Sequence, residues 1–105
     1  MTADDNGNVA GVTERGDVFW INNGKQIPAP EGIEPDACYK AAFFSQDGQL
    51  YLGTTDNKVY VYTMKSGKPV LESRIVMDGC ETINCFYQTE NGELFVCSDT
   101  GVALL

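Results

Sequence analysis

One strand-turn-strand pattern occurs three times in this chain, and it constrains the fold more than any other feature. The clearest copy is GQLYLGTTDNKVYVY, which starts at Gly48. An ungapped copy starts at Gly7, 41 residues earlier, and a looser copy starts at Gly92, 44 residues later. A repeat of this length, with several short strands in each unit, is typical of the blades of a β-propeller.

The residue types within each copy favour strands joined by tight turns. Aliphatic and aromatic residues fill the expected strands. Asp47-Gly48 and Asn91-Gly92 are typical of hairpins with type I′ turns, which need positive φ at both central residues. Asp56-Asn57 marks the next hairpin. Four strands are expected in the middle unit, near residues 38–46, 49–54, 58–63 and 70–77. Apolar residues show no helical periodicity, so no helix longer than one turn is expected.

The repeat divides the chain into three units. Residues 1–36 form a partial blade and an inter-blade loop, 37–79 a complete blade, and 80–105 a partial blade that lacks its last strand. The first unit is expected to start at residue 8, without an opening strand. The expected fold is therefore all-β, with about two and a half four-stranded antiparallel β-propeller blades. A small stand-alone β-sandwich, with the repeat left by duplication, is the alternative.

A partial propeller is expected to need partners. Propellers close with four to eight blades, and the outer blades of a shorter array expose apolar faces and unpaired strand edges. The chain is therefore interpreted as an excerpt of a larger protein or as a unit that associates. Other propeller blades or a second copy of the chain are the expected partners, and the isolated chain is expected not to stay a simple monomer.

Charge and composition exclude several classes of function. The net charge is −8, with 15 acidic and 7 basic residues, which argues against nucleic acid and anionic membranes as partners. No apolar run is long enough to span a membrane. Histidine is absent, which removes histidine-based catalytic triads and the usual near-neutral proton shuttle. We expect a module without catalytic residues or a cofactor.

The sequence predicts no metal site, and it leaves the state of the four cysteines open. No two cysteines are separated by two residues, and no histidine is present to complete a zinc site. The acidic turn at residues 4–7 lacks the spacing of a calcium loop and is interpreted as ordinary turn chemistry. The cysteines are interpreted as small buried apolar residues. Alternatively, a three-residue turn at residues 90–92 places Cys85 opposite Cys97, where a disulfide is possible.

Candidate binding residues lie on two expected strands and on one long loop. Trp20 is expected on the opposite face of its strand from Phe19, where it lines a ligand surface or covers a sheet edge. The loop at residues 24–36 contains Pro28 and Pro30, and long inter-blade loops of this kind carry binding function in propellers. A plain linker remains the alternative. Trp20, Pro28, Pro30 and Tyr39 form the candidate set for an unknown small molecule or glycan.

The three copies, DGQLYLGTTDNKVYVY, NGELFVCSDTGVALL and NGNVAGVTERGDVFWI, resemble the two-component regulator propeller repeat. Cys97 replaces the usual glycine of that repeat, and Gly11 and Val12 blur the first copy. The resemblance implies a ligand-sensing or assembly module from the extracytoplasmic β-propeller of a bacterial, membrane-anchored receptor. In that family the output is a histidine kinase or a diguanylate cyclase. A fragment of an enzymatic propeller, of lyase or quinoprotein type, and a structural protein-interaction propeller are the alternatives.

Overall fold

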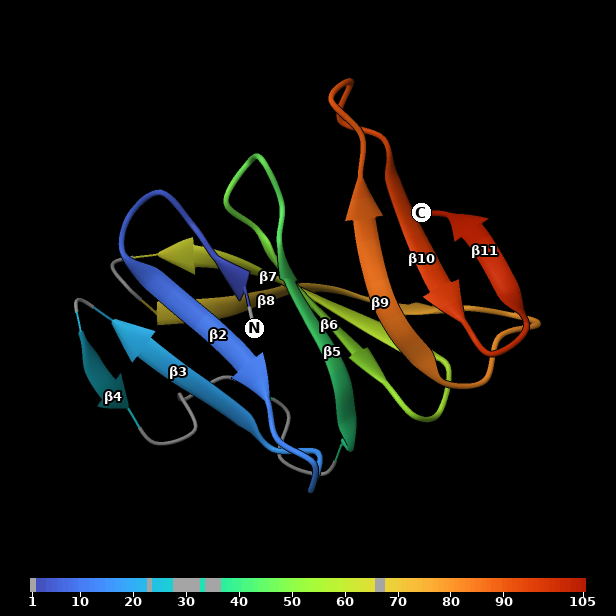
Figure 1. Ribbon diagram of the computed structural model, residues 1–105, viewed down its shortest axis with the longest axis horizontal. Helices are drawn as coiled ribbons and strands as arrows, with labels where there is room; N and C mark the ends of the chain where they lie inside the picture. Colours follow the sequence, from blue (N-terminus) through green and yellow to red (C-terminus); the bar gives the residue numbers. More distant parts are fainter. Residues whose placement is uncertain (1, 23, 28–32, 34–36, 66–67) are drawn as a thin grey trace.

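The computed structural model describes residues 2–22, 24–27, 33, 37–65 and 68–105. Every regular element in these ranges is a strand, and the strands form three antiparallel sheets (Figure 1). The all-β prediction is therefore confirmed, as is the absence of a helix from the described residues. No helix in the described part of the chain is long and apolar enough to cross a membrane.

Each sheet is formed from strands that are consecutive in the sequence. The first sheet has the order β1 (Thr2–Ala3), β2 (Asn8–Val12), β3 (Val18–Asn22), β4 (Lys25–Ile27). The second sheet has the order β5 (Tyr39–Phe44), β6 (Leu50–Thr54), β7 (Lys58–Lys65), β8 (Lys68–Val76). The third sheet has the order β9 (Ile83–Gln88), β10 (Leu94–Ser98), β11 (Gly101–Leu104). The four strands predicted in the middle unit correspond to the second sheet.

The first sheet differs from its prediction by one strand. The sequence pattern predicts that this unit starts at residue 8, but β1 precedes it and pairs with β2 through Ala3 and Val9. A strand of two residues is too short to show an alternating pattern, so nothing in its composition reveals it. All three sheets therefore have an opening strand: β1, β5 and β9.

The turns between the first two strands of the three sheets have the same hydrogen bonds. Asp4, Ser45 and Thr89 occupy their first positions, and the backbone N–H of each donates to the carbonyl four residues later, at 2.9, 2.9 and 2.8 Å. The side-chain oxygen of each also accepts the N–H of that same later residue, at 2.9, 3.2 and 3.1 Å. A short polar side chain at this position therefore replaces part of the strand ladder in every copy.

The glycine of this turn explains why the predicted turn type is wrong. Gly7, Gly48 and Gly92 have φ values of 86°, 81° and 89°, which side chains other than glycine rarely adopt. Among the described residues only Asn57 has positive φ without being glycine, so Asp47 and Asn91 do not form type I′ turns. The loops have three residues, with glycine last, as in a type I turn followed by a bulge.

Two hydrophobic cores separate the three sheets. The first core lies between the first and second sheets and is formed by buried Ala10, Val18, Trp20, Tyr39, Phe44, Leu50, Leu52, Tyr60 and Tyr62. The second core lies between the second and third sheets and is formed by Ala41, Val59, Val61, Met77, Ile83, Phe86, Leu94 and Val96. The second sheet is buried on both faces, because its alternating residues belong to different cores.

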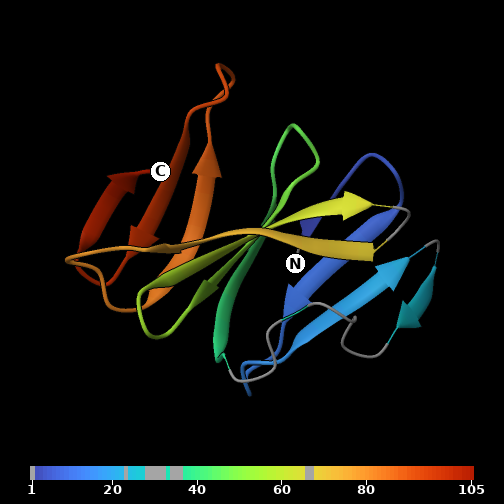
Figure 2. The same cartoon turned by 180° about the vertical axis from the view of Figure 1, so that it is seen from behind.

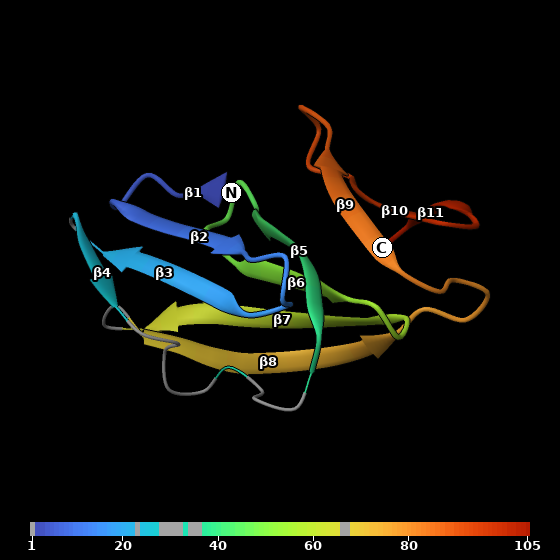
Figure 3. The ribbon, with the colours of Figure 1, turned by 60° about the horizontal axis from the view of Figure 1, so that its bottom comes forward.

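The first strands of the three sheets lie side by side, with β5 between β1 and β9 (Figure 3). The backbone N–H of Phe44 in β5 donates to the Thr2 hydroxyl in β1 at 2.9 Å. After β5, the backbone N–H of Gln46 donates to the Gln88 side-chain oxygen at the end of β9, at 2.7 Å. The sheets are therefore tied together at their first strands.

Candidate functional site

Trp20 does not lie on a ligand surface or at a sheet edge. Its side chain is 1% exposed, in the first core, and its ring meets Phe44 edge-on with centroids 5.9 Å apart. The indole is large and apolar, and the space between two sheets is where such a group loses the most contact with water. Trp20 aligns with Val61, which is also buried, so the repeat itself contained the signal that corrects this expectation.

The other predicted binding residues are Tyr39, which lies in the core, and two prolines. Tyr39 is 4% exposed in the first core, where it meets Tyr60 edge-on at 6.0 Å. It therefore packs between two sheets instead of lining an open surface. Pro28 and Pro30 lie outside the described residues.

Cys85 and Cys97 face each other, as the three-residue turn predicts. They are directly opposed in the β9–β10 pair, and both are free thiols. Thr89 and Glu93 are hydrogen-bonded to each other at the end of this strand pair, and hydrogen-bonded pairs recur at every second position of an antiparallel ladder. Cys85 and Cys97 fall on this series, so they are also a hydrogen-bonded pair, for which Cα atoms lie about 5.5 Å apart. A hydrogen bond with Cys97, burial and the charge of the neighbouring thiolate raise the pKa of the Cys85 thiol.

Mild oxidation is expected to join these two thiols. A Cα separation of about 5.5 Å lies within the range of disulfides. With oxidised glutathione as the oxidant, each thiol loses its hydrogen, one disulfide forms and two molecules of reduced glutathione leave. Intact mass and alkylation are expected to show two thiols fewer, and Cys80→Ser is expected to leave this loss unchanged. Four alkylatable thiols after oxidation, or a loss that survives Cys97→Ser, would contradict the pairing.

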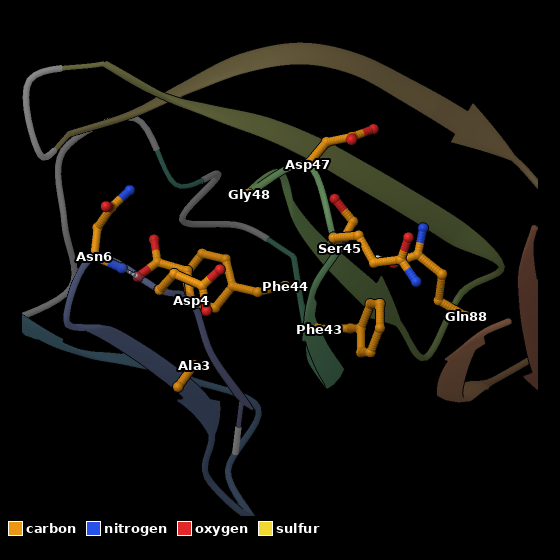
Figure 4. A pocket seen from close by; sticks show the side chains of 11 residues that line it. Ala3, Asp4, Asn6, Phe43, Phe44, Ser45, Asp47, Gly48 and Gln88 are labelled. Carbon is orange, nitrogen blue, oxygen red and sulfur yellow. Dashed lines mark hydrogen bonds between the residues drawn. The ribbon is translucent and has the colours of Figure 1, made fainter. Parts of the chain in front are cut away.

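A polar hollow lies where the β1–β2 turn, the β5–β6 turn and the end of β9 come together (Figure 4). We call it the turn pocket. It has a volume of about 600 Å³. Its lining residues come from the β1–β2 turn, the end of β5 with the β5–β6 turn, and the end of β9: Ala3, Asp4, Asp5, Asn6, Phe43, Phe44, Ser45, Gln46, Asp47, Gly48 and Gln88.

Hydrogen bonds within and between the turns hold the walls of the turn pocket. The Gln46 side-chain amide donates to the Thr89 carbonyl at 2.9 Å. This bond adds to the hydrogen bond from the Gln46 backbone N–H to the Gln88 side-chain oxygen. In the β1–β2 turn, burial opposes ionisation of Asp4. Hydrogen bonds from the Asn8 side chain, the Asn8 backbone and the Asn6 backbone outweigh it, so the pKa of Asp4 is lowered. The carboxylate is therefore charged at neutral pH and is held in place.

The chemistry of the turn pocket suits hydrogen bonding to a polar ligand. Its lining offers carboxylates, side-chain amides and a hydroxyl, beside two phenylalanine rings. Carboxylates accept hydrogen bonds, and amides and hydroxyls both donate and accept them. In the described part of the chain no three acidic or cysteine side chains come together as metal ligands. The pocket therefore offers hydrogen-bonding contacts to the hydroxyl groups of a ligand.

The sequence does not identify the turn pocket, although the repeat shows which positions of its walls correspond. Its walls are formed at equivalent positions of different copies, such as Asp4 and Ser45. Repeat alignment shows that these positions correspond, but only the packing of first strand against first strand brings them to one place. The sequence therefore predicts the turns without predicting the pocket that they share.

Comparison with known proteins leaves the family open. No family model matches the chain, and no curated protein matches its sequence.

Proposed function

We propose that this chain is a section of a β-propeller that works as a ligand-sensing module without catalytic activity. The turn pocket is the proposed site, and a small neutral glycan is the proposed class of ligand. The observation that carries the proposal is the convergence of polar side chains from three successive units on one hollow of about 600 Å³. Hollows of this size accommodate small ligands.

Two features of the fold support the propeller part of this proposal. The same turn, with the same side-chain hydrogen bond, recurs in all three sheets. First strands also lie side by side while the sheets stack face to face, as blades do around a central axis. Loops at one end of such an array are the usual place for binding residues.

The proposed setting follows from the resemblance of the repeat to receptor propellers. In that setting the chain belongs to the extracytoplasmic part of a bacterial, membrane-anchored signalling receptor, and ligand binding changes how blades or protomers associate. The proposal includes no reaction step, because the sequence contains no histidine and the turn pocket is assigned to hydrogen bonding alone. An enzymatic propeller with its catalytic residues elsewhere is the competing function.

Binding of neutral oligosaccharides tests the proposal. A glycan array identifies the best binder, and titration calorimetry then measures its affinity. Asp47→Asn removes one carboxylate from the pocket lining while it keeps the shape of the side chain. We expect affinity to fall about fivefold or more, because a hydrogen bond to a carboxylate is worth roughly 1 kcal/mol more than one to the neutral amide oxygen that replaces it.

Asp78→Asn is the matched control, because Asp78 is exposed and lies outside the pocket lining. Its affinity for the same oligosaccharide is expected to equal that of the unmodified chain. Equal loss of affinity in both variants, or no binding to any neutral oligosaccharide, would sink the glycan proposal.

A further inference from the structure

The third sheet has one apolar face that no other sheet of the described residues covers. Figure 2 shows this sheet at one end of the array, with the second sheet between it and the first. Its uncovered side chains include Tyr87, Val102 and Leu104, which are 62%, 67% and 60% exposed. Phe95 lies directly between Tyr87 and Leu104 in the strand pairing. We call these four side chains the forward face of the third sheet. Exposed apolar patches of this kind mark interaction sites.

The equivalent positions in the other two sheets show what such a face packs against. In the first sheet they include Val18 and Trp20, which pack on the second sheet in the first core. In the second sheet they include Val59 and Val61, which pack on the third sheet in the second core. Val102 aligns with Val59 and Val18. The forward face of each sheet is therefore built to meet the rear face of a following sheet.

One rear face of this kind remains uncovered by any described sheet, and it belongs to the first sheet. Its side chains alternate with those of the first core and are half-buried Val9, Phe19 and Ile21. Val9 aligns with Leu50 and Leu94, which are rear-face residues buried in the first and second cores. This rear face is also apolar and close-packed, because the Phe19 ring covers Gly11.

We propose that the forward face of the third sheet in one copy docks on the rear face of the first sheet in a second copy. The contact is head to tail, so it continues the stacking of the three sheets from one chain into the next. A contact between two different faces leaves a free face at each end, and copies can therefore add to both ends. The inference goes beyond ligand sensing and does not depend on the turn pocket.

Charge sets the expected salt dependence. Each copy carries a net charge of −8, and repulsion between copies is screened within about 8 Å at physiological ionic strength. Burial of apolar side chains is insensitive to this screening. Association is therefore expected to strengthen as salt increases, whereas an interface held by ion pairs would weaken.

Two single variants test the pairing of the two faces. Val102→Asp blocks the forward face, and Phe19→Asp blocks the rear face. Light scattering across a concentration series is expected to show association of the unmodified chain and monomers for each variant alone. An equimolar mixture is expected to give a dimer, because the free rear face of one variant still meets the free forward face of the other. Leu71→Asp, at an exposed position of β8, is the control and is expected to associate normally.

Several outcomes would overturn the head-to-tail contact. They are a monomeric unmodified chain at high concentration, association of Phe19→Asp equal to that of the unmodified chain, and a mixture of folded variants that stays monomeric. The second outcome would indicate two forward faces packed on each other. Circular dichroism verifies that each variant is folded, and Ile21→Asp replaces Phe19→Asp if the latter unfolds.

Discussion

Val59→Asp is expected to unfold the chain. Val59 is fully buried in β7, within the second core, and is paired with Gly53 and Ile75 on the neighbouring strands. An unpaired carboxylate at this position loses its hydration without gaining a partner, which costs several kcal/mol. Because small domains are stable by only about 5–15 kcal/mol, this cost is comparable with the whole free energy of unfolding. Thermal denaturation followed by circular dichroism measures the effect.

Val76→Asp is the matched control for this variant. Val76 lies in β8 of the same sheet and is 50% exposed, so its carboxylate stays hydrated. Its melting temperature is expected to remain close to that of the unmodified chain. If both variants melt like the unmodified chain, Val59 does not lie in a core between two sheets.

Trp20→Ala is expected to destabilise the chain by about 3–5 kcal/mol, the range for removal of a large aromatic side chain from a core. Trp20 is almost completely buried and packs against Phe44 across the first core. Substitution therefore leaves a cavity between the first and second sheets. Urea denaturation followed by circular dichroism measures the loss, because the variant has no tryptophan for fluorescence.

Tyr87→Ala is the comparison for Trp20→Ala. Tyr87 is a large aromatic residue on the uncovered face of the third sheet, so its removal creates no cavity within the chain. Measured at concentrations where the chain is monomeric, it is expected to change the free energy of unfolding by less than about 0.5 kcal/mol, as surface substitutions usually do. Equal losses from both variants would mean that Trp20 is not in a core.

The repeat predicts most of the strands, because each unit contains its own local signals. Aromatic and aliphatic residues separated by turn residues predict β5 to β8 within two residues at each end. The same signals fail for β1, because Thr2–Ala3 is too short to show alternation. They also fail for the turn type at Asp47-Gly48, because dipeptide composition does not distinguish a two-residue loop from a three-residue loop that ends in glycine.

Burial of Trp20 and the existence of the turn pocket depend on contacts between sheets. Alternation along a strand shows that Trp20 and Phe19 point to opposite faces, but it does not show which face meets another sheet. Aligned residue Val61 gives a partial answer, since a valine at the same position of the next unit favours the core. The pocket has no such local signal, because Asp4, Ser45 and Gln88 meet only when first strands pack side by side.

Three sheets stack in chain order, with the second sheet between the first and the third. Nuclear Overhauser contacts between aromatic side chains of the isotope-labelled chain test this order most directly. We expect contacts from the Trp20 ring to Phe44 and from Phe43 to Phe86, whose ring centroids are 5.9 and 6.2 Å apart. Contacts from Trp20 to Phe86, or to any residue of the third sheet in place of Phe44, would contradict the stacking order and indicate a closed sandwich.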